Sequence, residues 1–106
     1  MKKKLAVPAL AVAAATVFAT PTGAATRVRV DDDVFRPGSV TVRSGTTVTW
    51  RWVGDNPHNV TVTRGPVKFR SRTKTSGRFS KRMRRRGRYR IVCTVHPGMD
   101  MTLRVR

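Results

Sequence analysis

Four side chains in the second half of the chain could together bind a metal ion: His58, Cys93, His96 and Met99. The last three lie in one short segment, residues 93–99 (CTVHPGM), whose Pro-Gly pair is a turn signal. Two imidazoles and one thiolate in a trigonal site, with a weak axial thioether, are the ligand set that suits copper in electron-transfer sites. The spacing therefore predicts a copper site built by one tight loop and by a histidine far upstream.

Simpler interpretations stand beside this one. Cys93 is the only cysteine, so an internal disulfide is excluded, and a free buried thiol or an intermolecular bridge would also explain it. His58 could be an ordinary loop histidine beside a turn, and Met99 could simply fill a gap in the core. The occurrence of all four ligand types in this order favours the metal site.

The elements that must position these residues have the pattern of β-strands. Apolar and polar residues alternate with a period of two, which indicates strands with one buried face. Pro-Gly, Ser-Gly and similar turn signals separate the runs, and residues 64–76 are irregular and basic. We expect an all-β, single-domain Greek-key β-sandwich without helices, in which a strand end can bring His58 beside the ligand loop. The alternating runs are residues 28–30, 40–42, 48–52, 60–62, 89–91 and 103–105.

The N-terminal residues have a different composition. Three lysines (Lys2–Lys4) precede an apolar run that ends in small residues, as in a secretory signal peptide. We expect residues 1–25 to be the signal peptide, cleaved after Ala25 or after Ala24, and residues 26–106 to be the mature domain. A retained anchor helix is the alternative, although the run is short and rich in alanine for a membrane span. The mature domain would be exported, periplasmic or extracellular, without a membrane span.

The order of these features resembles the cupredoxins, the small blue copper proteins such as plastocyanin, pseudoazurin and amicyanin. The resemblance covers nearly all of the expected mature domain. It rests on residues 45–50 (GTTVTW), 57–60 (PHNV) and 87–93 (GRYRIVC), followed by the ligand loop. The two-residue gap between His96 and Met99 is similar to the short amicyanin loop.

The resemblance implies a role for each site residue. His58, Cys93 and His96 would be the strong copper ligands and Met99 the weak axial one. Asn59 would hold the ligand loop and donate a backbone hydrogen bond toward the Cys93 sulfur. Cupredoxins usually have glycine shortly after the axial methionine, whereas this chain has Met101 near that position. Met101 is therefore a competitor for the axial position, and the loop spacing favours Met99.

The resemblance also implies a function. We expect a type 1 copper protein that carries single electrons between redox partners by switching between Cu(I) and Cu(II), and that is not an enzyme. Copper capture or delivery is one alternative, and a basic polyanion-binding module on the same scaffold is another. No catalytic dyad, triad or phosphate-binding glycine motif is visible, and Asp31–Asp33 lack the spacing of an oxygen-ligand metal loop. We expect a monomer with no specific nucleic-acid partner.

The charge of the chain is strongly positive. It has 23 Lys and Arg against 5 Asp and Glu, a formal net charge of +18, and removing Lys2–Lys4 would leave +15. Such a surface attracts an acidic redox partner or an anionic surface. A run of charge is more often a solvated face, so both interpretations stay open for the densest stretch. That stretch contains Lys81, Arg82, Arg84, Arg85, Arg86 and Arg88.

Overall fold

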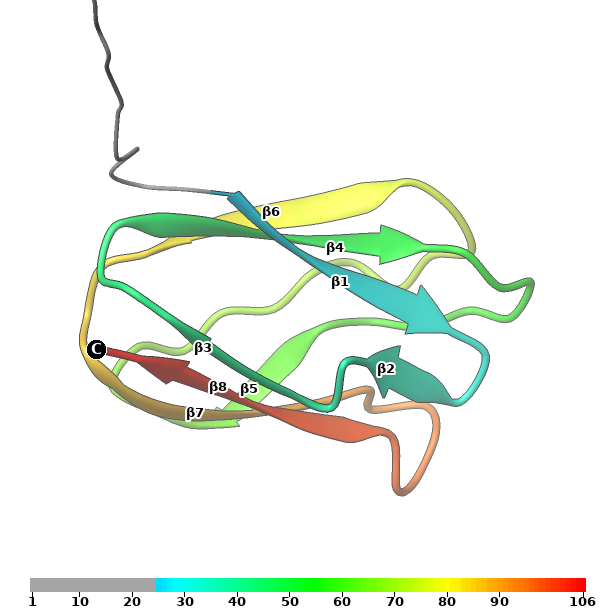
Figure 1. The fold of residues 1–106 in the computed structure, drawn as a ribbon. Coiled ribbons are helices and arrows are strands. Elements are labelled where there is room, and N and C mark those ends of the chain that lie inside the picture. Colours follow the sequence, from blue (N-terminus) through cyan, green and yellow to red (C-terminus); the bar gives the residue numbers. More distant parts are fainter. Residues whose placement is uncertain (1–24) are drawn as a thin grey trace, which may run out of the picture.

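The computed structural model describes residues 25–106, which form eight β-strands and no helix (Figure 1). The predicted signal peptide lies outside the described residues except for Ala25, which begins the first strand. No helix in the described range is long and apolar enough to cross a membrane. The strands are β1 (Ala25–Asp31), β2 (Val34–Arg36), β3 (Ser39–Val42), β4 (Thr46–Trp52), β5 (Thr61–Arg64), β6 (Arg78–Met83), β7 (Gly87–Val92) and β8 (Asp100–Val105).

The strands pair into two four-stranded sheets that face each other. Sheet A has the order β2-β1-β4-β6, and sheet B has the order β3-β8-β7-β5. The pairs β1–β4 and β3–β8 are parallel, and the other pairs are antiparallel. Because β3 leaves sheet A for sheet B and β4 returns, the chain crosses between layers as a Greek key does. The predicted all-β sandwich is confirmed.

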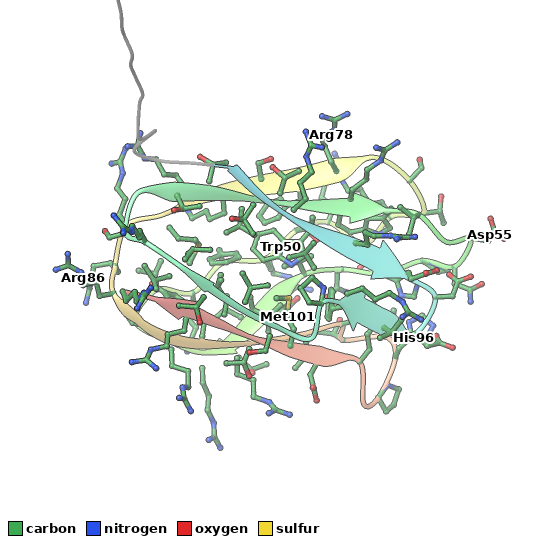
Figure 2. All side chains as sticks on the ribbon, in the orientation of Figure 1. Trp50, Asp55, Arg78, Arg86, His96 and Met101 are labelled. Atoms are coloured by element: carbon green, nitrogen blue, oxygen red, sulfur yellow. The ribbon has the colours of Figure 1, made fainter. Side chains whose placement is uncertain are left out.

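The core lies between the sheets and follows the alternation of the sequence. In β4, Val48, Trp50 and Trp52 are buried, whereas the residues between them face outward. Successive side chains of a strand point to opposite faces, so the inward face of β4 is apolar after Thr46, which is also buried. The ring centroid of Trp50 lies 6.1 Å from that of Phe69 and 5.9 Å from that of Phe79. Trp50 thus sits at the centre of the core (Figure 2).

The alternating runs did not predict two strands, β2 and β6. The strand β2 has three residues, too few to show a period. In β6 the inward positions are held by Phe79, Lys81 and Met83. The Lys81 ammonium lies over the ring of Phe69, 5.6 Å from its centroid, which is within the range of a cation–π contact. Because a lysine holds an inward position, the sequence of β6 does not show the alternation of apolar and polar residues that is typical of a strand.

The irregular segment predicted at residues 64–76 is largely confirmed, except that Arg64 ends β5. This segment is tied to the chain just before it by two isolated β-bridges, His58 with Lys74 and Thr61 with Arg70. The Ser71 hydroxyl accepts a hydrogen bond from the Val60 backbone at 2.9 Å. The connection is therefore ordered by backbone contacts although it contains no strand of its own.

Three connections gather at one end of the sandwich: β1–β2, β4–β5 and β7–β8, on the right in Figure 1. The turn between β6 and β7 lies at the other end. The first end carries all of the predicted ligands, because His58 belongs to the β4–β5 connection and the other three to the β7–β8 connection.

Candidate metal centre

Both backbone polar groups of His58 make hydrogen bonds. Its backbone N–H donates to the Lys74 carbonyl at 3.0 Å, and its carbonyl accepts from the Lys74 N–H at 3.0 Å. The same carbonyl accepts a bond from the Trp52 indole at 3.1 Å. The His58 side chain is fully buried. The backbone of His58 is therefore fixed by hydrogen bonds, and its ring is enclosed by the surrounding side chains.

The β7–β8 connection is closed by its own backbone. The Cys93 N–H donates to the Met99 carbonyl at 2.9 Å, and the Met99 N–H donates to the His96 carbonyl at 3.1 Å. Pro97 and Gly98 make the turn, where Gly98 has a φ of 86° that side chains rarely adopt. Cys93 and Met99 are buried, whereas the His96 side chain is 26 % exposed.

The two connections bring three donor atoms together. His58 Nδ1 lies 3.9 Å and His96 Nδ1 lies 3.6 Å from the Cys93 sulfur, and the two nitrogens are 3.1 Å apart. A metal with bonds of about 2.0–2.3 Å to nitrogen and sulfur in a trigonal plane would separate its donors by about 3.5–3.8 Å. The observed triangle fits a metal ion with little adjustment. A trigonal site of two imidazoles and one thiolate indicates copper.

The two methionines near this triangle differ in their contacts. The Met101 sulfur accepts a hydrogen bond from the Trp50 indole at 3.3 Å, inside the core (Figure 2). Met99 is buried in the ligand loop itself and is 2 % exposed. Met101 alternates inward with Leu103 along β8, as a core residue does. The sulfur of Met101 is thus engaged away from the ligand loop.

Asn59 ties three segments together through hydrogen bonds of its side chain. Its fully buried amide donates to the hydroxyls of Thr73 at 2.9 Å and of Thr94 at 2.8 Å. Its carbonyl oxygen accepts from the Thr94 backbone N–H at 3.1 Å and from the Thr61 hydroxyl at 2.8 Å. Asn59 therefore holds the residue that follows Cys93. The described contacts contain no hydrogen bond from the Asn59 backbone N–H to the Cys93 sulfur, so that part stays a prediction.

Asp32, which the sequence did not mark as a site residue, lies beside the His58 ring nitrogen that faces away from Cys93. Its carboxylate is 3.2 Å from His58 Nε2 and accepts backbone N–H bonds from Asn56 at 2.9 Å and Asp55 at 3.0 Å. These hydrogen bonds lower the pKa of Asp32 below its usual value, because they stabilise the charged form. The bond from Asn56 has the largest effect, followed by those from Asp55 and His58. A Cβ at Gly54 would overlap this carboxylate, so only glycine at position 54 leaves room for the Asp32 side chain.

Asp33 has the corresponding position on the second histidine. Its carboxylate lies 3.3 Å from His96 Nε2 and is 68 % exposed. Asp33 has a positive φ of 64°, a conformation that Asp and Asn tolerate in tight turns. The turn between β1 and β2 thus brings a carboxylate to each histidine. The sequence shows three consecutive aspartates, but only the fold shows which ring nitrogens they face.

The predicted basic cluster does not lie at the metal centre. Lys81 and Arg82 are in β6, Arg84–Arg86 form the following turn, and Arg88 is in β7. Figure 2 shows Arg86 at one end of the sandwich and His96 at the other. A partner bound to this cluster would be separated from the metal triangle by the length of the sandwich.

Comparison with known proteins agrees with the fold and the triangle. The profile of copper binding proteins of the plastocyanin/azurin family matches residues 23–106. An oxidised amicyanin variant is similar with a TM-score of 0.69 and 26% identity, over 77% of this chain and 82% of that chain. A search of curated protein sequences finds no match.

Two more distant structures share the fold alone. A purple cupredoxin from Nitrosopumilus maritimus has a TM-score of 0.69 and 22% identity, over 76% of this chain and 99% of its own. A copper-containing nitrite reductase from Thermus scotoductus has a TM-score of 0.67 and 23% identity, over 92% of this chain. This chain spans only 25% of that reductase.

The family profile covers every strand and every donor atom of the triangle. The triangle of His58, Cys93 and His96 lies where two connections of a Greek-key sandwich meet. The chain therefore belongs to the plastocyanin/azurin family of copper-binding proteins.

Proposed function

We propose that the protein is a type 1 copper electron carrier whose ion is held by His58, Cys93, His96 and Met99. The observation that carries this proposal is the convergence of both Nδ1 atoms on the Cys93 sulfur. Met99 is the proposed axial ligand, because it belongs to the ligand loop and because the Met101 sulfur is bound to Trp50. Copper, when bound, supplies a one-electron couple between Cu(I) and Cu(II).

The chain's own contribution is a ligand set that resists movement. His58 is fixed through Lys74 and Trp52, and the ligand loop is fixed through Asn59. A site whose ligands are held by packing and hydrogen bonds loses little energy to rearrangement when its charge changes. Rigidity of this kind suits a carrier, which must accept and release an electron without changing shape.

His96 is the proposed exit for the electron. Its side chain is 26 % exposed, whereas His58 is fully buried and Cys93 and Met99 are almost fully buried. A partner that contacts the protein at this end would therefore meet the imidazole of His96 first.

We propose a carrier rather than an enzyme. The chain has two histidines, and both belong to the same triangle. A second copper cluster for substrate chemistry would need further imidazoles. The likeness to a nitrite reductase supports the fold, because this chain spans a quarter of that protein.

The proposed setting is outside the cytoplasm, after removal of residues 1–25. The basic head, apolar run and small-residue exit of this segment support export. The proposed partner is an acidic redox protein and the proposed state is a monomer, because a net charge of +15 attracts anionic surfaces and repels a second copy.

Voltammetry of the copper-loaded mature domain tests the proposal. We expect a reversible one-electron wave, with peak positions that do not depend on scan rate over a wide range. An irreversible wave, together with tight Cu(I) binding and ready transfer of Cu(I) to a chelator, would indicate copper capture and delivery instead.

A further inference from the structure

The outer face of sheet A carries one arginine from each of its four strands. Arg36 of β2 is the register partner of Arg29 in β1, and Arg29 is also the partner of Arg51 in β4. Arg51 is in turn the partner of Arg78 in β6. All four residues are exposed, and Figure 2 shows Arg78 pointing away from the sandwich. Strands are about 4.8 Å apart, so this arginine row (Arg29, Arg36, Arg51, Arg78) spans about 14 Å.

The row is almost without neutralising charge. Its one ion pair in the described part of the chain joins Arg36 to Asp31, at 3.8 Å. The other described carboxylate pairs involve His58, His96 and Arg90. Like charges directly opposite one another on neighbouring strands destabilise a sheet. An anion lying across the row would remove this repulsion, and arginine is well suited to carboxylate because its guanidinium binds both oxygens.

The row lies close to the metal triangle along the chain. Arg29 is three residues before Asp32, whose carboxylate contacts the His58 ring. Arg51 precedes Trp52, whose indole binds the His58 carbonyl. Arg84–Arg86, in contrast, follow the far end of β6. An anionic partner on the arginine row would be nearer to the copper than one on the basic cluster at the β6–β7 turn.

The surroundings of the row favour a protein as its occupant. Four arginines, Arg27, Arg29, Arg36 and Arg51, line a shallow hollow together with Pro37 and Val53. Val53 is 42 % exposed, one of two large apolar side chains that are so open in the described residues. Protein interfaces combine arginine with apolar contacts. A polyanionic polymer binds through its charged groups and gains little from contact with an exposed valine.

We propose that the arginine row is the surface on which an acidic redox partner docks, with partner carboxylates across the guanidinium groups and apolar contact at Val53. The proposal rests on the proposed function, because it names the docking face of that electron carrier. The arginine row then takes the place of the Lys81–Arg88 stretch as the docking surface, and the Lys81–Arg88 stretch is a solvated face without a docking role.

The first test locates bound anions without any electron transfer. Hexacyanochromate(III), a paramagnetic and redox-inert trianion, is titrated into the 15N-labelled protein loaded with Cu(I). We expect the amide signals of Arg29, Arg51 and Arg78 to broaden first, with hexacyanocobaltate(III) as the diamagnetic control. Broadening that begins at Arg84–Arg86, or that is uniform over the surface, would overturn the proposal.

The second test compares two variants with the same loss of charge. R29Q/R51Q/R78Q removes three charges from the row, and R84Q/R85Q/R86Q removes three from the far turn. The measured reaction is oxidation of the Cu(I) protein by hexacyanoferrate(III), which takes one electron and becomes hexacyanoferrate(II). We expect the second-order rate at low salt to fall about 10-fold in the first variant and less than about 2-fold in the second. Equal falls would contradict a specific docking face.

A third comparison separates a protein partner from a nucleic acid. A ten-residue glutamate peptide and a ten-nucleotide thymidine strand compete with hexacyanochromate(III) for the row. We expect the peptide to displace the trianion at a concentration similar to, or lower than, the concentration at which the thymidine strand displaces it. Displacement by the strand at a 10-fold lower concentration would assign the row to nucleic acid. Because these binding maps need no redox step, they stand or fall separately from the voltammetry that tests the carrier function.

Discussion

Both histidines of the triangle have a carboxylate beside the ring nitrogen that faces away from Cys93. Asp32 lies 3.2 Å from His58 Nε2, and Asp33 lies 3.3 Å from His96 Nε2. A carboxylate at Nε2 keeps the proton there and leaves the Nδ1 lone pair directed at the metal position. It also makes the imidazole a stronger donor. Of the two, Asp32 is the better fixed, since two backbone N–H groups hold it.

Asp32→Asn tests this role. The amide oxygen can still accept the bonds from Asn56 and Asp55, but the negative charge beside His58 is lost. We expect Cu(II) affinity to fall about 10-fold, at the lower limit for such neighbours of a metal ligand. If Cu(I) affinity is unchanged, the reduction potential rises by about 60 mV. The measurements are competition with a copper chelator and voltammetry.

Asp31→Asn is the matched control, because it removes the same charge from a residue that pairs with Arg36 instead. A rise in potential of the same size in both variants would show a general charge effect. It would contradict a specific action of Asp32 on His58.

A second pair of residues tests the axial ligand. Met99→Gln is expected to shift the visible spectrum and the reduction potential of the copper protein, because the axial ligand tunes both. Met101→Gln is expected to leave the spectrum unchanged. It would lower the free energy of unfolding by about 1–3 kcal/mol, because it buries an amide where the Trp50 indole now contacts sulfur. A shifted spectrum in Met101→Gln alone would reverse the assignment.

At the scale of the element, the ligands meet because β1, β4 and β7 all end at the same end of the sandwich. The start of β7 is fixed by Tyr89, whose hydroxyl donates to the Arg85 carbonyl at 2.7 Å across the β6–β7 turn. Its ring packs so closely that a Cβ at Gly65 would lie 2.6 Å from it. Burial raises the pKa of Tyr89 above its ordinary value of 10.0. The phenol is therefore neutral and bonded in the folded protein.

Tyr89→Phe should remove this bond and lower the free energy of unfolding by about 1 kcal/mol at neutral pH. The pH dependence has a definite sign. Because the folded pKa is raised, the stabilisation is complete below pH 10 and is lost as pH rises through the folded pKa. Denaturant unfolding at alkaline pH should thus show a loss in the natural protein that is absent in the variant. Parallel pH profiles for the two proteins would contradict this.

The sequence alone predicted the fold where local pattern governs it. Strands such as β4 show their buried face as an uninterrupted alternation, and the ligand loop is contiguous, so both were predictable. The strand β6 was not, because Lys81 takes an inward position. The contact of Asp32 with His58 joins residues 26 apart, because β1 and β4 are parallel neighbours that end side by side. No local periodicity encodes such a contact, and it depends on the pairing of β1 with β4.

At the scale of the whole molecule, positive charge is distributed over both sheets and both ends. Four of the five carboxylates are already paired with Arg36, His58, His96 and Arg90. The remaining arginines and lysines repel one another in the compact state, which costs stability at low ionic strength. The arginine row and the β6–β7 turn both contribute to this excess of positive charge. They differ in their distance from the end of the sandwich that carries the metal triangle.

Salt should therefore stabilise this protein. We expect the Tm of the copper-loaded mature domain to rise as sodium chloride increases from low millimolar to about 0.15 M, where the screening length is about 8 Å. Sodium sulfate at the same ionic strength is the control for specific anion binding, which would add to the rise. A Tm that falls with salt would mean that favourable ion pairs outweigh repulsion.

The most direct test of the copper site is the visible absorption spectrum of the mature domain after addition of one equivalent of Cu(II), with Cys93→Ser as the reference. A thiolate bound to Cu(II) in a trigonal site with two imidazoles gives an intense blue band. The triangle of His58, Cys93 and His96 predicts that band in the natural domain and its complete absence in Cys93→Ser. A natural domain that has reduced Cys93, binds Cu(II) and remains without the band would contradict the proposed site.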